Sequence, residues 1–209
     1  MKIVTIIFFG IMCVAQWLIP GRMIYQSEDV ILSGTLYKFE TEPVDPSDPF
    51  RGKYIVLNFK EDVVEDSIKS TGAEWSSGET AFVRFGIDSD GFAHAIKILK
   101  VAPSDGDYLT TKVLYSDSDL DHIDTVTAKI NNSIVTTVQK RARVHFSIPF
   151  NRLYLEESKA QPAEEQYRIS QRDSTSTTYG LVRMGKGQAV LVDVMIDGKS
   201  IVDVVRELN

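Results

Sequence analysis

Cysteine is nearly absent from this chain of 209 residues, in which Cys13 is the only one. A single cysteine excludes an intramolecular disulfide. Because Cys13 lies within an apolar N-terminal run, its thiol is expected to behave as a small hydrophobic side chain. A lipoprotein signal would place a small residue directly before the cysteine, and Met12 stands there instead, so we do not expect lipidation.

Positive charge is also scarce, with 23 lysines and arginines against 29 aspartates and glutamates and a formal net charge of -6. The densest basic stretch, Lys140, Arg141 and Arg143, is short and is expected on the outward side of a strand. Nucleic-acid binding requires an extended basic patch, so the charge distribution argues against that class of partner. A content of 43% hydrophobic and 25% charged residues is typical of a folded globular protein.

Groupings of metal-binding or nucleophilic side chains are missing as well. The three histidines are isolated from one another, at His94, His122 and His145. Asp117, Asp119 and Asp121 have the spacing that opens a calcium loop, but the glycine that such a loop needs next is replaced by a histidine. Neither a Gly-x-Ser-x-Gly elbow nor a Ser-x-x-Lys pair occurs. We therefore expect no metal, no cofactor and no catalytic residue of these classes.

One long apolar segment is present, and it lies at the N-terminus, where no charged residue occurs between Ile3 and Ile19. Extended to Ile24, the segment forms about 33 Å of helix, enough for a hydrocarbon core of about 30 Å. Three interpretations are a cleaved signal peptide, a buried core helix and a retained anchor. We expect a retained single-pass anchor over residues 1–25, because no small-x-small cleavage site is evident. The short tail with Lys2 favours a cytoplasmic N-terminus and an extracytoplasmic C-terminal domain.

The remainder of the chain predicts β-structure. Segments with alternating or β-branched residues, bounded by turn residues, recur throughout. They are residues 31–39, 53–59, 80–87, 92–101, 108–114, 123–130, 134–148, 153–155, 177–184 and 188–196. Asp88 to Gly91 has the composition of a hairpin turn. Because only residues 63–70 and 158–166 predict helices, the expected fold class is all-β with minor helix after the N-terminal transmembrane helix.

A pair of weak matches indicates an internal repeat. At an offset of 100, Val44, Ser47, Pro49, Phe50 and Tyr54 recur as Val144, Ser147, Pro149, Phe150 and Tyr154. At an offset of 99, Val83 to Gly86 recurs as Val182 to Gly185 with one substitution. We expect two similar β-units, residues 26–115 and 116–209, either in tandem or within one compact domain. The alternative is two unrelated strands that follow similar proline turns.

The segment from Pro43 to Phe59 is the most informative in the chain. Its three prolines favour a stiff, extended path. Asp45 and Asp48 are suited to accept backbone N–H bonds in turns, and Arg51 is placed to pair with one of them. Gly52 permits a bulge or a positive φ where the strand begins.

This segment resembles the GDYXXLXY family, named for a glycine–aspartate–tyrosine strand motif. Here the motif runs from Gly52 to Phe59, with Lys53 in place of the aspartate and Phe59 in place of the final tyrosine. The loss of the aspartate argues against a catalytic role at that position. A second block from Pro149 to Glu157 and the C-terminal Gly187 to Ser200 are also similar to the family. The resemblance implies a membrane-anchored protein, often encoded beside a multi-pass membrane protein. It implies no particular biochemical activity.

The candidate site combines the two family-like blocks. Its residues are expected to form a binding or structural motif and are Asp45, Pro46, Asp48, Arg51, Gly52, Tyr54, Leu57, Phe59, Tyr154, Glu156 and Glu157. The favoured function is a binding or accessory subunit for a multi-pass membrane protein. The alternatives are a purely structural subunit and a cell-envelope hydrolase that pairs Asp45 and Asp48 with the two glutamates. Turn capping and ion pairs to Arg51 and Arg152 are the expected role of these acids instead.

Overall fold

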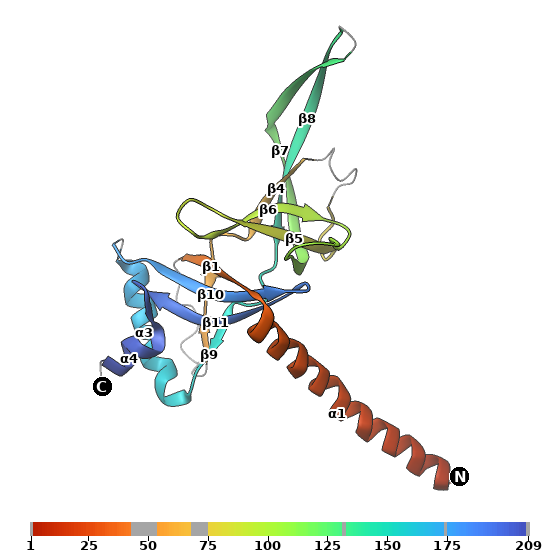
Figure 1. Cartoon of the computed structure of the whole chain (residues 1–209), viewed down its shortest axis with the longest axis vertical. Coiled ribbons are helices and arrows are strands. Elements are labelled where there is room, and N and C mark those ends of the chain that lie inside the picture. The colour runs from red at the N-terminus through yellow and green to blue at the C-terminus, as the bar shows by residue number, and fades with distance from the viewer. Residues whose placement is uncertain (1, 43–53, 68–74, 131–132, 174, 208–209) are drawn as a thin grey trace.

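The computed structural model describes residues 2–42, 54–67, 75–130, 133–173 and 175–207. Within these residues, a long helix leads into a β-rich body that contains two five-stranded sheets and one two-stranded sheet. Two shorter helices lie together at one side of the body (Figure 1). The expected fold class, an apolar N-terminal helix followed by a β-rich region, is confirmed.

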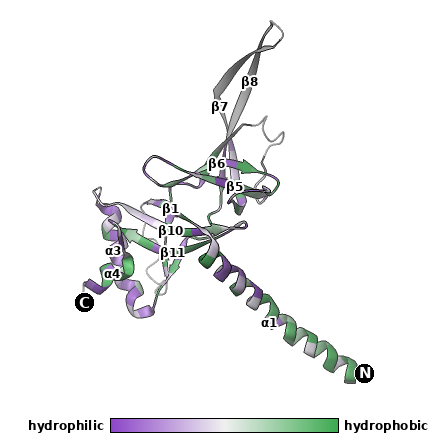
Figure 2. Cartoon of the chain, viewed as in Figure 1, coloured by the Kyte–Doolittle hydropathy of each residue, from purple (hydrophilic) through white to green (hydrophobic). Residues whose placement is uncertain are grey.

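Helix α1 spans Lys2–Ser33 and is longer than the 25 residues predicted for the anchor. It is apolar over its first two thirds, hydrophilic over a short stretch after that, and apolar again in the last turn, where it meets the body (Figure 2). By length and composition it could cross a membrane. The strand predicted from residue 31 begins only at Thr35, because Val30 is buried against the body and the polar residues before it continue the helix.

The first large sheet has the order β12-β11-β10-β1-β3, and its strands pair antiparallel. Strand β1 (Thr35–Glu42) lies between β10 (Thr178–Gly185) and the short β3 (Asn58–Phe59). Strands β11 (Gln188–Ile196) and β12 (Lys199–Ser200) complete it. The C-terminal end of α1 packs against strands β10 and β11 of this sheet.

The second large sheet has the order β4-β8-β7-β5-β6. Strands β5 (Thr80–Ile87) and β6 (Ala93–Leu99) form the predicted hairpin, in which Asp88 Oδ1 accepts the N–H bonds of Asp90 and Phe92. The helix predicted over residues 63–70 is wrong over residues 63–67, which form strand β4 (Val63–Ser67), and residues 68–70 lie outside the described residues. The backbone of β4 pairs with β8, and this long-range pairing overrides the local pattern.

Strands β7 (Leu109–Ile130) and β8 (Ser133–Phe146) extend beyond the second sheet as a two-stranded arm (Figure 1). The sequence predicts two strands, 108–114 and 123–130, where the structure has one. The acidic stretch between them continues the ladder with a shift of register between Asp119 and Ile123. The register places Asp117 opposite Arg143, and such pairs of opposite charge favour strand pairing.

The third sheet pairs β2 (Tyr54–Val56) with β9 (Arg152–Tyr154). Helix α3 (Glu157–Arg172) follows β9 and confirms the helix predicted over residues 158–166, extended by about two turns. A short helix at the C-terminal end, α4 (Ile201–Glu207), was not predicted. Helices α3 and α4 contact each other beside the first sheet.

Phenylalanine rings join the two large sheets in the core. Phe39 of β1 is fully buried, and its ring centroid lies 5.1 Å from that of Phe85 on β5. The ring of Phe150 lies 5.1 Å from that of Phe39 and 5.4 Å from that of Phe59. Burial of each ring contributes about 2 kcal/mol or more, so this cluster is a main source of cohesion between the sheets.

Each large sheet combines strands from both sides of residue 115. Strand β1 pairs with β10 in the first sheet, and β4 pairs with β8 in the second. The segments that repeat at an offset of 99 both lie in the first strand of an antiparallel hairpin, β5–β6 and β10–β11. The division into units 26–115 and 116–209 stays a prediction.

Candidate functional site

The first motif block is mostly a core element. Ile55, Leu57 and Phe59 are buried, with exposed fractions of 1%, 1% and 4%. Tyr54 and Val56, which alternate with them on β2, are half-buried. Leu57 and Phe59 of the motif therefore serve to pack the core. Tyr54 lies at the surface, so packing in the core does not account for a tyrosine at this position.

Five of the predicted site residues cannot be placed. They are Asp45, Pro46, Asp48, Arg51 and Gly52, and they lie outside the residues that the structure describes. The proposed turn bonds of the two aspartates and the pairing of Arg51 stay predictions.

The second block lies directly beside the first. The backbone N–H of Leu57 donates to the carbonyl of Asn151, with an N···O distance of 2.9 Å. Leu153 is buried at the centre of β9, whereas Arg152 and Tyr154 on either side of it are exposed. The two blocks, which are about 100 residues apart in the sequence, thus form one two-stranded sheet with a buried and an exposed face.

The exposed face carries a cluster of three side chains, Tyr54, Arg152 and Tyr154, which we call the tyrosine patch. The two tyrosine rings have centroids 5.5 Å apart. The Arg152 guanidinium carbon lies 5.2 Å from the centroid of the Tyr54 ring, in a cation–π arrangement. Tyr154 is 67% exposed. Tyrosine and arginine are enriched in the residues that dominate protein–protein binding energy, so the patch is suited to contact another protein.

Glu156 and Glu157 lie at the start of α3 and are exposed. A carboxylate oxygen of Glu156 is 2.8 Å from Lys159 Nζ, so the ion partner is Lys159 instead of the predicted Arg152. The hydrogen bond from Lys159 lowers the pKa of the Glu156 carboxyl. Glu157 occupies the first turn of the helix, where a negative charge interacts favourably with the helix dipole. Both positions are thus explained by the helix start.

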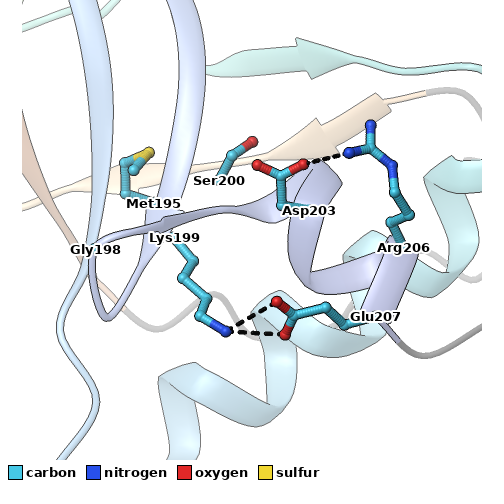
Figure 3. Close-up of a pocket in the computed structure, with 7 residues that line it drawn as sticks. All are labelled: Met195, Gly198, Lys199, Ser200, Asp203, Arg206 and Glu207. Atoms are coloured by element: carbon cyan, nitrogen blue, oxygen red, sulfur yellow. Dashed lines mark hydrogen bonds and ion pairs between the residues drawn. The ribbon is translucent and has the colours of Figure 1, made fainter.

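A surface groove of about 560 Å³ lies between the β11–β12 turn and α4 (Figure 3). Its lining residues are Met195, Gly198, Lys199, Ser200, Asp203, Arg206 and Glu207. The four charged side chains pair with one another, Lys199 with Glu207 at 2.9 Å and Arg206 with Asp203 at 2.8 Å. Each of the four charges is thus held in an exposed ion pair within the lining of the groove itself.

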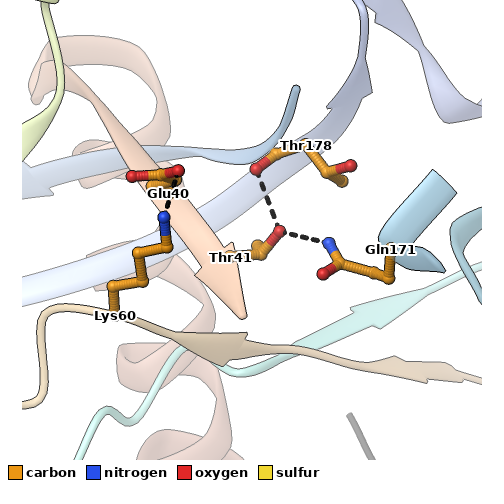
Figure 4. Close-up of polar contacts among 5 residues, drawn as sticks. All are labelled: Glu40, Thr41, Lys60, Gln171 and Thr178. Carbon is orange, nitrogen blue, oxygen red and sulfur yellow. Dashed lines mark hydrogen bonds and ion pairs between the residues drawn. The ribbon is translucent and has the colours of Figure 1, made fainter. Parts of the chain in front are cut away.

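A buried polar network, which the sequence did not reveal, ties α3 to the first sheet (Figure 4). Thr41 Oγ1 donates to the carbonyl of Thr178 at 2.9 Å and accepts a bond from Gln171 Nε2 at 2.7 Å. Beside it, Lys60 donates to the carboxylate of Glu40. None of these residues belongs to a motif, and the two bonds of Thr41 each bridge more than 100 residues of sequence, so no local signal pointed to them.

Tyr167 of α3 is buried near this network, with 4% of its surface exposed. Its hydroxyl has no hydrogen-bond partner among the described residues. Burial raises the pKa of Tyr167 to about 12, with a smaller opposing effect from the Thr41 hydroxyl. The buried positions Ala160, Ala163 and Tyr167 follow helical spacing, a pattern that marks Tyr167 as part of the packed face of α3.

The junction between α1 and the body is tightly packed. The Gly34 N–H donates to the Val30 carbonyl at 2.8 Å and closes the helix. The Gly34 carbonyl accepts a bond of 2.8 Å from Arg183 Nη1 of β10. A Cβ atom added to Gly34 would lie 2.5 Å from the Val30 carbonyl oxygen and 2.9 Å from that of Met184. The chain therefore passes from helix to strand through a single residue that only glycine fits.

An ion pair adds a second contact at this junction. Lys186, in the β10–β11 turn, lies 2.7 Å from the Asp29 carboxylate on α1. The hydrogen bond to Asp29 raises the pKa of the Lys186 ammonium. Lys186 has a positive φ of 53°, and Gly187 next to it has a φ of 82°. The tight turn thus presents the ammonium group to the last turns of α1.

Comparisons with known proteins agree with the motifs. Residues 16–194 match the family described as GDYXXLXY protein, which covers the polar end of α1, both motif blocks and most of the β-rich body. No curated protein and no solved structure matches the chain.

Proposed function

Because the chain belongs to the GDYXXLXY family, we propose that it is an extracytoplasmic β-domain, anchored by α1, that serves as a binding or accessory subunit of a multi-pass membrane protein. In this arrangement α1 crosses the membrane once, with its N-terminus in the cytoplasm. The short N-terminal tail with Lys2 supports this orientation.

The rigid junction between α1 and the body is the observation that carries the proposal. After the apolar part of α1 ends near Tyr25, the helix continues to Ser33, about 12 Å further. Val30 packs into the body there, and Gly34 leaves no flexible linker. A domain that acts on soluble molecules can work on a flexible tether, whereas a subunit that docks on an embedded partner benefits from a fixed height and orientation.

The tyrosine patch is the surface that we assign to this contact. Figure 1 shows β9 and the first turns of α3 on the side of the body from which α1 leaves. Among the described residues, the Arg152 guanidinium lies over the Tyr54 ring and has no carboxylate within ion-pair distance, and in the proposed contact it pairs with acidic or carbonyl groups of the partner. Exposed tyrosine rings add large contact area at low entropic cost.

A linker insertion tests the proposal. Six Gly-Ser residues placed between Ser33 and Gly34 would uncouple the body from α1 without altering either. The control carries the same six residues in the exposed β5–β6 turn, between Asp90 and Gly91. Both full-length variants and the wild-type chain are purified from membranes in mild detergent, and co-purified proteins with several apolar helices are quantified.

We expect at least tenfold less of the co-purified multi-pass protein with the junction insertion, and wild-type amounts with the control. Both variants should unfold in a single cooperative transition, which excludes misfolding as the cause, and the junction variant should be the less stable because it loses contacts of Val30 and Gly34. Equal recovery with the flexible junction would contradict the proposed role of a fixed orientation. Absence of any multi-pass protein with the wild-type chain would contradict the proposed function itself.

A further inference from the structure

Gln16 is the most polar side chain within the uncharged run of α1, and among the described residues it has no hydrogen-bond partner. The apolar part of α1 is not covered by the rest of this chain. In hydrocarbon, an amide group without a partner is costly, and membrane helices satisfy such groups by bonds to neighbouring helices. Gln16 therefore marks a side of α1 that requires a neighbour.

Pro20 leaves a second polar group of Gln16, its backbone carbonyl, without its usual hydrogen bond. In an α-helix, the N–H of residue 20 would donate to the carbonyl of Gln16, and proline has no N–H. The carbonyl and the side-chain amide of one residue therefore both lack their usual partners. Prolines within membrane helices are tolerated where neighbouring helices supply the missing bonds.

The direction of this polar side can be related to the body. Gln16 and Gly34 are 18 residues apart, which is five turns of 3.6 residues, so they lie on the same side of α1. Thr5 precedes Gln16 by 11 residues, about three turns, and Cys13 lies one turn before it. We call Thr5, Cys13 and Gln16 the polar face. Because Gly34 and Val30 pack against the sheet, the body overhangs the polar face.

We propose that the polar face of α1 packs against a membrane-spanning helix of the partner, directly beneath the body, and that this helix carries a hydrogen-bonding side chain at the depth of Gln16. The inference rests on the proposed function and names the surface that makes the contact within the membrane. The tyrosine patch and the polar face would then hold the same partner outside and inside the bilayer.

A second copy of this chain does not fit the polar face. Two copies related by a two-fold axis would present the same face to each other, with helix axes about 8–10 Å apart. A body of this size has a radius of gyration of about 16 Å, and each body lies on the inner side of its own helix. The two bodies would occupy the same space, whereas a partner without such a domain leaves room for one.

The single cysteine provides a direct test in membranes that contain the full-length chain. The chain is purified in detergent, where a maleimide–benzophenone reagent can label its one cysteine, Cys13, and is returned to the membranes, where illumination links the label to whatever lies beside the polar face. The control moves the label to the opposite side by Cys13→Ser with Ile7→Cys, since Ile7 and Gln16 are nine residues, or two and a half turns, apart.

We expect a crosslink from Cys13 to a multi-pass membrane protein, with at least fivefold lower yield from the control position. Gln16→Leu should lower the yield similarly, and Gln16→Asn should retain most of it. A variant that moves the amide across the helix, Gln16→Leu with Val14→Gln, keeps one amide in the helix and should not restore the yield.

Crosslinks to a second copy of the chain, to lipid alone, or equally from both positions would overturn the inference. If Gln16→Leu leaves recovery of the partner unchanged while the flexible junction abolishes it, the inference fails and the proposed function stands. If no multi-pass protein is recovered with the wild-type chain, both fail.

Discussion

Tyr54 and Tyr154 lie directly opposite each other on antiparallel strands, with ring centroids 5.5 Å apart. Their separation of 100 residues equals the offset at which the two motif blocks repeat. These two equivalent residues therefore face each other, and from them the antiparallel strands diverge, so that Ile55 pairs with Leu153. The side of the pair that faces the body is filled by Ile55 and Leu153, and the other side is open to partners.

Substitutions in the tyrosine patch should separate binding from stability. Arg152→Ala and Tyr154→Ala remove exposed side chains and should lower the free energy of unfolding by about 1 kcal/mol or less. Either change should reduce recovery of the membrane partner at least tenfold in the detergent purification. Leu153→Ala, between them but buried, should cost about 2–5 kcal/mol in thermal unfolding of the full chain. Unchanged recovery with both patch variants would remove the patch from the proposed contact.

The close contacts of Gly34 predict a different kind of sensitivity. Gly34→Ala should lower the free energy of unfolding by about 1–3 kcal/mol, because the added methyl group meets two backbone oxygens that cannot move aside easily. Gly21→Ala is the matched control, since a Cβ atom at that position has open space around it. Thermal unfolding of the detergent-purified chains measures both. Equal melting of the two variants would show that the junction is looser than the structure indicates.

The buried hydroxyl of Tyr167 should make the protein sensitive to high pH. Its pKa rises from an ordinary value of about 10 to about 12 in the folded state. The unfolded state therefore loses this proton first, and about 3 kcal/mol of stability should disappear between about pH 10 and pH 12. Denaturant unfolding measured across this range should show the loss in the wild type and a smaller one in Tyr167→Phe.

At neutral pH the same substitution should be nearly neutral or stabilising by about 1 kcal/mol, because the hydroxyl has no hydrogen-bond partner to lose among the described residues. Thr41→Val is the contrasting change, since it breaks bonds to Thr178 and Gln171 and should destabilise by about 1–3 kcal/mol. Strong destabilisation by Tyr167→Phe would mean that the hydroxyl is bonded after all.

The hydrolase hypothesis and the structural role of the acidic segment make opposite forecasts. If Arg51 pairs with Asp45 or Asp48 in a shielded turn, Arg51→Ala and the Asp→Asn changes should cost about 3 kcal/mol or more. If the aspartates act in catalysis, Asp45→Asn and Asp48→Asn should spare stability and abolish hydrolysis. Thermal melts of the three variants distinguish these outcomes, and unchanged melting in all three would argue against the structural role.

The sequence predicted correctly those elements whose conformation depends mainly on their own residues and their near neighbours in the chain. The Asp88 to Gly91 turn and the helix after Glu156 are specified by their own residues, and both were found. Strand β4 was mistaken for a helix because its state depends on pairing with β8, about 80 residues away. The end of α1 was placed too early because the packing of Val30 against the body leaves no mark in the local sequence.

The motif residues of the site were found from the sequence, but the sequence alone did not show which of them pack in the core and which lie at the surface. Leu57 and Tyr54 belong to one motif, and only the alternation of β2 shows that the first is a core residue and the second a surface residue. The cation–π contact of Arg152 was missed, because a carboxylate is the more obvious partner for an arginine than a tyrosine ring 98 residues away. Cross-strand register, which creates that contact, is a property of the folded chain.

The tight junction at Gly34 also fixes the orientation of the body relative to the axis of α1. A transmembrane helix tilts more in a thin bilayer and stands more upright in a thick one, at a cost of fractions of a kcal/mol per ångström of mismatch. If a flexible linker joined α1 to the body, a change in the tilt of the helix would not change the orientation of the body. In the proposed arrangement the body leans with α1, so the thickness of the surrounding bilayer would set the angle at which the arm of β7 and β8 projects from the membrane.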